Sequence, residues 1–138
     1  MMTILLLSTA IAIVVSFLCS LAEALLLSLN PIALNHLQAA RPQAAESWRR
    51  LKRNIARPIT AILVLNTVAH TGGATVAAGA FAELYGERNI WIYSVLFTVV
   101  ILFGTEILPK ILGVTFRARL APVAGPALEI VTKLLHPL

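Results

Sequence analysis

The sequence predicts an all-α membrane protein with three transmembrane helices per protomer and a belt of juxtamembrane helices on the cytoplasmic side. Of its 138 residues, 59% are hydrophobic and only 12% are charged, a composition typical of integral membrane proteins that leaves no soluble domain of useful size. Three apolar stretches are each long enough to cross a hydrocarbon core of about 30 Å. Basic residues gather in the segments that flank these stretches.

We expect the three spans at residues 3–29, 58–84 and 90–115. Around the turn between the second and third spans there are two glutamates and a single arginine. The connection between the first two spans carries Glu46 against a set of basic residues: Arg41, Arg49, Arg50, Lys52, Arg53 and Arg57. Because connections rich in lysine and arginine stay in the cytoplasm, we expect a multi-pass protein of the cell (inner) membrane with its N-terminus outside and its C-terminus in the cytoplasm.

A first interfacial helix is expected at residues 43–57. Asn30-Pro31 ends or kinks the first span, and the basic connection then places Trp48, Leu51 and Ile55 on one stripe of an amphipathic helix. The alternative for this segment is a solvated basic loop.

A second interfacial segment is expected at residues 120–138. Pro122, Gly125 and Pro126 are expected to break the chain there, and the remaining apolar residues are too few to cross a bilayer. We therefore expect this tail to lie along the inner face of the membrane, with a truncated fourth span as the alternative.

The net charge of +5 raises the question of a nucleic-acid partner. The charge is concentrated in the segments that flank the spans, where membrane topology explains it. We therefore expect the lipid bilayer, and no nucleic acid, as the partner of these basic residues.

Glu106 is the most informative residue, because a carboxylate within a membrane span is costly and marks a functional site. Pro109 follows it and is expected to kink the helix, since a proline cannot donate to the carbonyl four residues earlier, here that of Thr105. A carboxylate and a freed backbone oxygen suit hard cations such as Mg²⁺ and Na⁺. The alternative for Glu106 is pairing with Lys110 one turn later.

Polar residues of the other spans fall at a similar depth. Counting about 1.5 Å per residue from the cytoplasmic ends places Ser20, Asn66 and Glu106 roughly 12–14 Å inside. Helical spacing adds further polar residues to the same faces, namely Ser16, Glu23 and His70. Two carboxylates, two hydroxyls and an amide in one layer suit a dehydrated cation, so we expect a metal site between the three helices.

Each of these residues also has a structural explanation. Serine hydroxyls in membrane helices often bond to their own backbone. Asn66 could hold two helices together, and His70 could be a buried histidine with satisfied hydrogen bonds. Glu23 could reach the interface or pair with a nearby arginine.

Two short segments carry a resemblance to a known family. Ser20-Leu21-Ala22-Glu23 and Glu106-Ile107-Leu108-Pro109-Lys110 resemble the Ser-x-x-Glu and Glu-x-x-Pro-Lys elements of the CNNM transmembrane domain of the CorC/CNNM magnesium transporters. The resemblance covers essentially all of residues 1–138 and implies a homodimer that exports Mg²⁺ in exchange for Na⁺. It also implies Mg²⁺ ligands at Ser20, Asn66 and Glu106, with the backbone oxygen of Thr105 as a further ligand.

The sequence departs from the family pattern in two places. Where better-known members read Asn-Asn-x-x-Asn, this chain has Asn66, Thr67 and His70, and the glycine often found before the glutamate is Thr105. An imidazole is a poor Mg²⁺ ligand and a good one for softer metals. His70 is therefore either a donor that orients a ligand or, if Mn²⁺ or Co²⁺ is the cargo, a ligand itself. Full-length members also carry cytoplasmic CBS domains and often a CorC-HlyC domain, so we expect this chain to be the membrane domain of a longer protein.

A small-residue face and two rival classes of function complete the expectations. Gly73, Ala77 and Ala80 recur at helical spacing on the second span and predict a close-packing face, through which we expect the two protomers of a dimer to pack in part. Ser20 and His70 could suggest an intramembrane enzyme, but without a Gly-x-Ser-Gly context or oxyanion donors we expect no enzyme. A purely structural or regulatory membrane module would leave the burial of Glu106 uncompensated.

Overall fold

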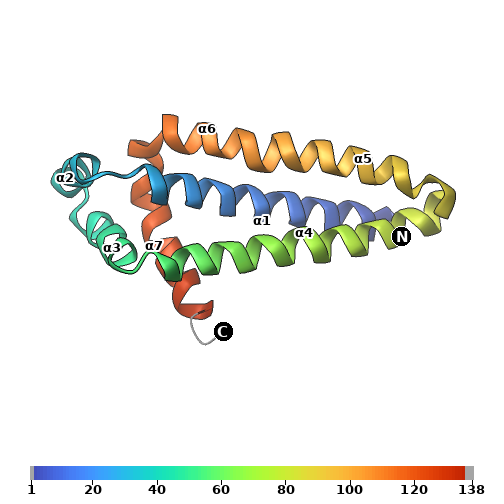
Figure 1. The fold of residues 1–138 in the computed structure, drawn as a ribbon, viewed down its shortest axis with the longest axis horizontal. Helices are drawn as coiled ribbons and strands as arrows, with labels where there is room; N and C mark the ends of the chain where they lie inside the picture. Colours follow the sequence, from blue (N-terminus) through green and yellow to red (C-terminus); the bar gives the residue numbers. More distant parts are fainter. Residues whose placement is uncertain (1, 136–138) are drawn as a thin grey trace.

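Three long helical rods form the body of the protein (Figure 1). The computed structural model describes residues 2–135, and this part of the chain is helical throughout apart from short turns, with no strand. The rods are α1 (Met2–Ser28), α4 (Ala56–Tyr85), and a third rod that comprises α5 (Ile90–Ile101), η2 (Leu102–Ile107) and α6 (Leu108–Thr115). Each is long and apolar enough to cross a membrane, which confirms the three expected spans.

The outer faces of the rods are apolar and uncovered. Large side chains such as Leu6 of α1, Leu63 of α4 and Val95 of α5 are exposed, whereas a water-soluble bundle would place polar residues there. Lipid is the solvent that suits this surface, so the chain is a multi-pass membrane protein.

The helix α1 is the central rod. It packs against α4 along its length and against η2 and α6 on another side. Tight contacts occur where side chains are smallest: a Cβ added to Gly73 of α4 would lie 2.5 Å from the Cβ of Ala12, and one added to Gly113 of α6 would lie 2.8 Å from the Cβ of Ala24. Close approach of this kind is how helices gain van der Waals contact in lipid.

The third span is irregular at the predicted place. Residues 102–107 form a π-helical segment, in which the N–H of Leu108 donates to the carbonyl of Phe103 five residues earlier. Pro109 then sits in the first turn of α6, where a missing N–H costs least. The wider turn directly precedes Pro109 and contains Glu106, and π-helical turns are frequently found at functional sites.

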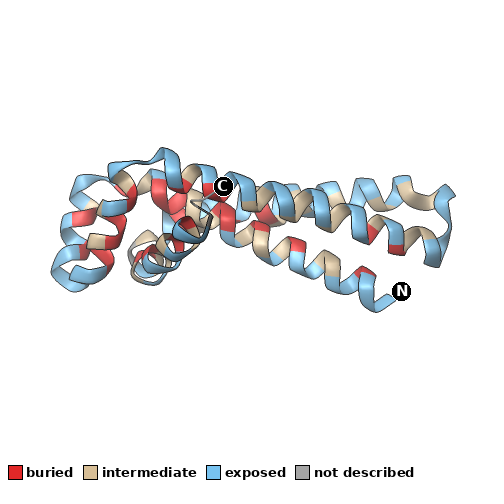
Figure 2. Cartoon of the chain, turned by 90° about the horizontal axis from the view of Figure 1, so that it is seen from below, coloured by how far each residue is buried: buried red, intermediate tan, exposed pale blue. Residues whose placement is uncertain are grey.

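Three shorter helices cap one end of the bundle, which we call the belt end. They are α2 (Pro31–Ala40), α3 (Pro42–Arg53) and α7 (Arg117–Leu135), and the buried residues of the chain concentrate around them (Figure 2). The opposite end carries the short helix η1 (Glu87–Asn89). The first span ends before Asn30-Pro31 as expected, and Asn30 then caps α2 by accepting a hydrogen bond from the N–H of Ala33 at 2.8 Å.

The expectation that Pro122, Gly125 and Pro126 break the chain is wrong. Both prolines lie inside α7, which is continuous from residue 117 to 135. An interior proline costs a helix about 3 kcal/mol, and here tertiary packing offsets that cost. The indole of Trp48 is fully buried, donates to the carbonyl of Ala121 at 2.8 Å and fills the space that a Cβ on Gly125 would need.

The helix α7 runs across the bundle and not parallel to it as a fourth span (Figure 1). The other interfacial helix, expected at residues 43–57, extends from Pro42 to Arg53, and α4 already begins at Ala56. The last three residues of the expected tail, 136–138, lie outside the described part of the chain.

Two basic residues of the belt end have a structural task. The ammonium group of Lys52 donates to the carbonyls of Leu26 and Leu29, and the guanidinium of Arg117 donates to the carbonyl of Ser28 at 2.8 Å. These carbonyls terminate α1 and have no intrahelical partner. Burial lowers the pKa of Lys52, and the bonds to the helix end compensate its lost hydration.

Candidate functional site

A cluster of polar side chains lies between the three spans, centred on Ser16 of α1. The hydroxyl of Ser16 lies 2.8 Å from Oδ1 of Asn66 on α4 and 3.1 Å from Oγ1 of Thr105 in η2. It also contacts Nε2 of His70, one turn along α4. Ser16 and Thr105 are fully buried, so these contacts form inside the bundle and away from lipid.

With the amide oxygen of Asn66 turned toward Ser16, as in the structure, the cluster has more acceptors than protons. A serine hydroxyl carries one proton and cannot donate to Asn66 and Thr105 at once. The hydroxyl proton of Thr105 is committed to the carbonyl of Ile101, at 2.6 Å. Even when Nε2 of His70 carries the ring proton and donates to Ser16, two oxygens still compete for the single serine proton. A positive charge at this point would satisfy the surplus lone pairs.

Ser20 extends the cluster by one helical turn toward the belt end. Its hydroxyl is buried and has no hydrogen-bond partner among the described residues. A buried hydroxyl left unpaired costs roughly 1–3 kcal/mol, and an interior serine normally bonds to its own helix. An oxygen that is withheld from its own backbone is available to a ligand.

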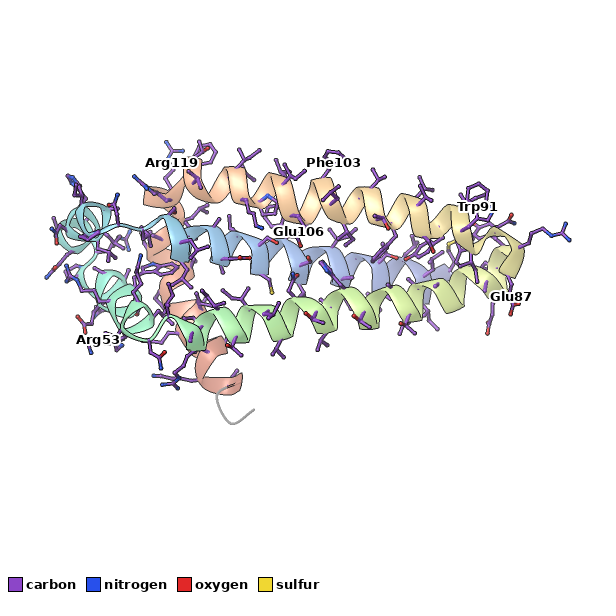
Figure 3. All side chains as sticks on the ribbon, viewed as in Figure 1. Arg53, Glu87, Trp91, Phe103, Glu106 and Arg119 are labelled. Atoms are coloured by element: carbon purple, nitrogen blue, oxygen red, sulfur yellow. The ribbon has the colours of Figure 1, made fainter. Side chains whose placement is uncertain are left out.

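Glu106 lies in η2, on the side of the third span that faces the bundle, whereas Phe103 points outward (Figure 3). One carboxylate oxygen is 3.7 Å from Nζ of Lys110 and the other is 3.9 Å from Nε2 of His70. The pairing with Lys110 that we considered as an alternative is therefore present in the structure. Both distances exceed a hydrogen bond, and no described residue donates one to this carboxylate. Lys110 is also about half exposed, which weakens its hold on Glu106.

Two expectations about the layer need adjustment. Asn66 bonds to Ser16 and not to Ser20, one turn away, because depth counting assumed that all spans begin in one plane, whereas α4 begins at Ala56, before Pro58. Glu23 is partly buried and makes no hydrogen bond or ion pair with any residue in the described part of the chain. It shares the face of Ser20 but is not joined to the cluster.

The small-residue face of α4 packs within the protomer. Ala77 and Ala80 are buried against Leu5 of α1, and Gly73 lies against Ala12. Ala77 and Ala80 are covered by the chain itself and Gly73 is partly covered, so these residues belong to the α1–α4 contact and leave little surface for the expected contact between protomers.

The donor set favours a hard cation over a soft one. Within residues 2–135 no group of three or more His, Cys, Asp or Glu side chains is arranged to hold a metal ion. What converges is mostly oxygen, from hydroxyls, an amide and one nearby carboxylate, with Nε2 of His70 beside it. Oxygens of this kind are the ligands of Mg²⁺ and similar ions.

The same residues do not form a hydrolytic triad. In a triad the nucleophile and the carboxylate contact opposite nitrogens of the imidazole. Here Ser16 and Glu106 both approach Nε2 of His70, so neither would orient the ring for the other. The arrangement is therefore not a Ser-His-carboxylate triad.

The side chain of Thr105 is the main element that sequence reasoning missed. Only its backbone oxygen was expected to take part, yet its hydroxyl lies in the centre of the cluster. The sequence did contain a sign of this role. Thr105 directly precedes Glu106, and it replaces a glycine, which has no hydroxyl, that is often found at this position. A π-helical turn, which rotates the following residues, was not predictable from periodicity alone.

The fold and this site define a class: a multi-pass helical membrane protein with an oxygen-lined polar centre between its three spans. The chain belongs to the CNNM family, because residues 7–138 match the Cyclin M transmembrane N-terminal domain. The sequence resemblance to this family is thereby confirmed.

Three relatives extend the comparison. The chain is 29% identical over 126 residues to a UPF0053 protein of Synechocystis, covering 89% of this chain and 36% of that protein. It is 27% identical over 128 residues to a UPF0053 protein of Haemophilus influenzae, covering 93% and 30%. It is 26% identical over 118 residues to a chloroplastic DUF21 domain-containing protein of Arabidopsis thaliana, covering 86% and 18%. The chain thus spans about a third or less of the length of these relatives.

Proposed function

We propose that this domain exports Mg²⁺ through the polar centre between its three spans, in exchange for Na⁺. The observation that carries the proposal is the proton shortage around Ser16, where Asn66 and Thr105 compete for one proton. A dehydrated cation satisfies these oxygens together, and the carboxylate of Glu106 supplies the compensating negative charge. Membership of the CNNM family supports a transporter-type role.

The proposed ligand set differs slightly from the expected one. It comprises Ser16, Ser20, Asn66, the hydroxyl of Thr105 and Glu106, and His70 orients the hydroxyl of Ser16 from the adjacent turn. Because Glu106 holds no short hydrogen bond, its carboxylate can turn toward an incoming ion without breaking one. The ammonium of Lys110 would then be released to the lipid interface.

We further propose that the protein works as a homodimer in the cell (inner) membrane, with its belt end in the cytoplasm. The basic residues of α3 and α7 lie at that end, and segments rich in lysine and arginine tend to stay on the cytoplasmic side of the membrane. The faces of α4 and α5 that remain uncovered offer the area for a second protomer.

A softer divalent cation such as Mn²⁺ or Co²⁺ is the second candidate cargo. The contact between Ser16 and Nε2 of His70 favours it, because an imidazole nitrogen at the centre of the cluster is a good ligand for such metals. A structural or regulatory module without transport is the remaining alternative, and the unpaired hydroxyl of Ser20 argues against it.

The test is Mg²⁺ binding by the purified chain, measured by isothermal titration with Glu106→Gln and, as a matched control, Glu87→Gln. Glu87 is exposed in η1 at the opposite end of the bundle, so its substitution removes the same charge outside the site. We expect Glu106→Gln to lose Mg²⁺ binding at an unchanged helical content, and Glu87→Gln to bind as wild type. Unchanged Mg²⁺ affinity in Glu106→Gln would exclude the site, and competition by Na⁺ in the wild type tests the coupling ion.

A further inference from the structure

A second cluster of charge lies at the belt end, away from the polar centre. A cavity of about 540 Å³ opens between the end of α1, the helix α2 and the start of α7. Its charged lining is entirely basic and consists of Arg41, Arg117 and Arg119, and the side chain of His36 also lines it. The rest of its lining is apolar and includes Leu29, Leu37 and Pro122. No carboxylate of the described residues lines it.

The arginines of this cavity form no ion pair with any residue that the structure describes. Within residues 2–135, ion pairs join Arg50 and Arg53 to Glu46, Arg50 to Glu129, and Lys110 to Glu106, and none involves an arginine of the cavity. Arg117 is held in place by its bond to the carbonyl of Ser28, whereas Arg41 and Arg119 are exposed. Like charges gathered without a counter-charge repel one another, so an anion would relieve the cavity.

The depth of the cavity identifies the anion. Leu29 directly follows the first span, and Arg117 lies just beyond the end of the third. This is the level at which the hydrocarbon core ends and lipid phosphates begin. Figure 3 shows Arg119 at this end of the bundle, beyond the ends of the rods. The level is the same whichever way the protein is oriented in the membrane.

We propose that this cavity binds the headgroup of an anionic phospholipid. The guanidinium groups of Arg41, Arg117 and Arg119 pair with the phosphate, for which the planar fork of arginine is well suited. The apolar lining around Leu37 and Pro122 accommodates the glycerol and the first methylenes. Basic pockets at the ends of transmembrane helices recognise anionic headgroups in this way. The site is separate from the polar centre and does not depend on which ion is transported.

The test compares two double variants with the same change of charge. Arg41→Gln/Arg119→Gln removes two cavity cations and spares Arg117, which caps α1. Arg57→Gln/Arg88→Gln removes two exposed cations that do not line the cavity. Native mass spectrometry of the full chain in detergent measures the binding of phosphatidylglycerol and, separately, of phosphatidylcholine.

We expect the wild type to bind phosphatidylglycerol in preference to phosphatidylcholine. In the cavity variant the affinity for phosphatidylglycerol should fall by about thirtyfold, as the loss of two arginines near a headgroup predicts. The control variant should remain within about twofold of the wild type, since its arginines lie elsewhere. Circular dichroism checks that both variants keep the helical content of the wild type.

Three results would overturn the proposal. Equal losses in the two variants would mean that general surface charge, and not this cavity, holds the lipid. Equal affinity of the wild type for phosphatidylglycerol and phosphatidylcholine would show that the cavity does not select an anionic headgroup. Displacement of the lipid by glycerol phosphate at equal concentration would assign the cavity to a soluble phosphate compound.

Discussion

Substituting Gly73 by alanine tests how α1 and α4 are held together. An ideal Cβ on Gly73 would lie 2.5 Å from the Cβ of Ala12, whereas two carbon atoms in van der Waals contact are about 3.5–4.0 Å apart. The two helices would therefore have to separate by about 1 Å along their contact. Overpacking of this size costs about 1–3 kcal/mol, and alanine returns up to about 1 kcal/mol through its better helix propensity. The expected net effect is a destabilisation of about 1 kcal/mol.

The neighbouring residue provides a matched control. A Cβ added to Gly72 meets no atom within 4 Å, so Gly72→Ala should gain the helix propensity without a clash. The two variants should thus differ by about 2 kcal/mol in free energy of unfolding, in opposite directions from the wild type. Unfolding by sodium dodecyl sulfate in mixed micelles, followed by circular dichroism, measures the difference.

Equal unfolding midpoints for Gly72→Ala and Gly73→Ala would refute the assignment of the Gly73 face to packing within the protomer. A larger loss for Gly72→Ala would place the critical contact of α4 on its uncovered face, as expected if a second protomer packed there. Measuring at several protein concentrations separates the two contacts, because only a contact between protomers depends on concentration.

Three further outcomes are expected. Trp48→Phe removes the bond to the carbonyl of Ala121 and should lower the free energy of unfolding by about 2 kcal/mol, measured by thermal melting. A hydrogen bond from Arg50 lowers the pKa of Glu129 in the folded protein. The pair therefore contributes its full stabilisation above the unfolded pKa of about 4.3, and this stabilisation is lost as the pH falls through the pKa of Glu129 in the folded protein. Acid should then shift the melting temperature more in the wild type than in Arg50→Gln. Finally, His70→Asn should preserve Mg²⁺ affinity in titration, because an amide also donates to Ser16; a Mn²⁺ preference in the wild type that this substitution abolishes would instead make His70 a direct ligand.

The spans were predictable because the bilayer imposes a simple length and composition on them. Apolar runs interrupted by basic or turn residues placed all three rods within a few residues of their ends. The belt end was less predictable, since its helices depend on contacts between distant segments. Between its two prolines α7 packs against Trp48, which lies 73 residues earlier than Ala121 and donates to its carbonyl. No local pattern around the prolines carries that information.

The sequence indicated part of the polar cluster but not its register, and it did not indicate the hydroxyl of Thr105 or the separation of Glu23 from the cluster. Helical spacing grouped the polar faces of α1 and α4, and the cost of a buried carboxylate singled out Glu106. Which serine meets Asn66 depends on the vertical offset between two helices, and small-residue contacts such as that of Gly73 with Ala12 set this offset. The part of Thr105 depends on the π-helical turn, which periodicity does not report.

The central position of α1 has a consequence for biosynthesis. Ser16 contacts partners that lie 50 and 89 residues further along the chain, so at a synthesis rate of about 5–20 residues per second they follow it by roughly 2.5–18 s. During that interval the hydroxyls of α1 must bond to their own backbone in the lipid. Assembly of the polar centre then exchanges these local bonds for contacts with α4 and η2. A nascent chain arrested after α4 would be inserted in the membrane and would still lack the oxygens that the third span contributes to the polar centre.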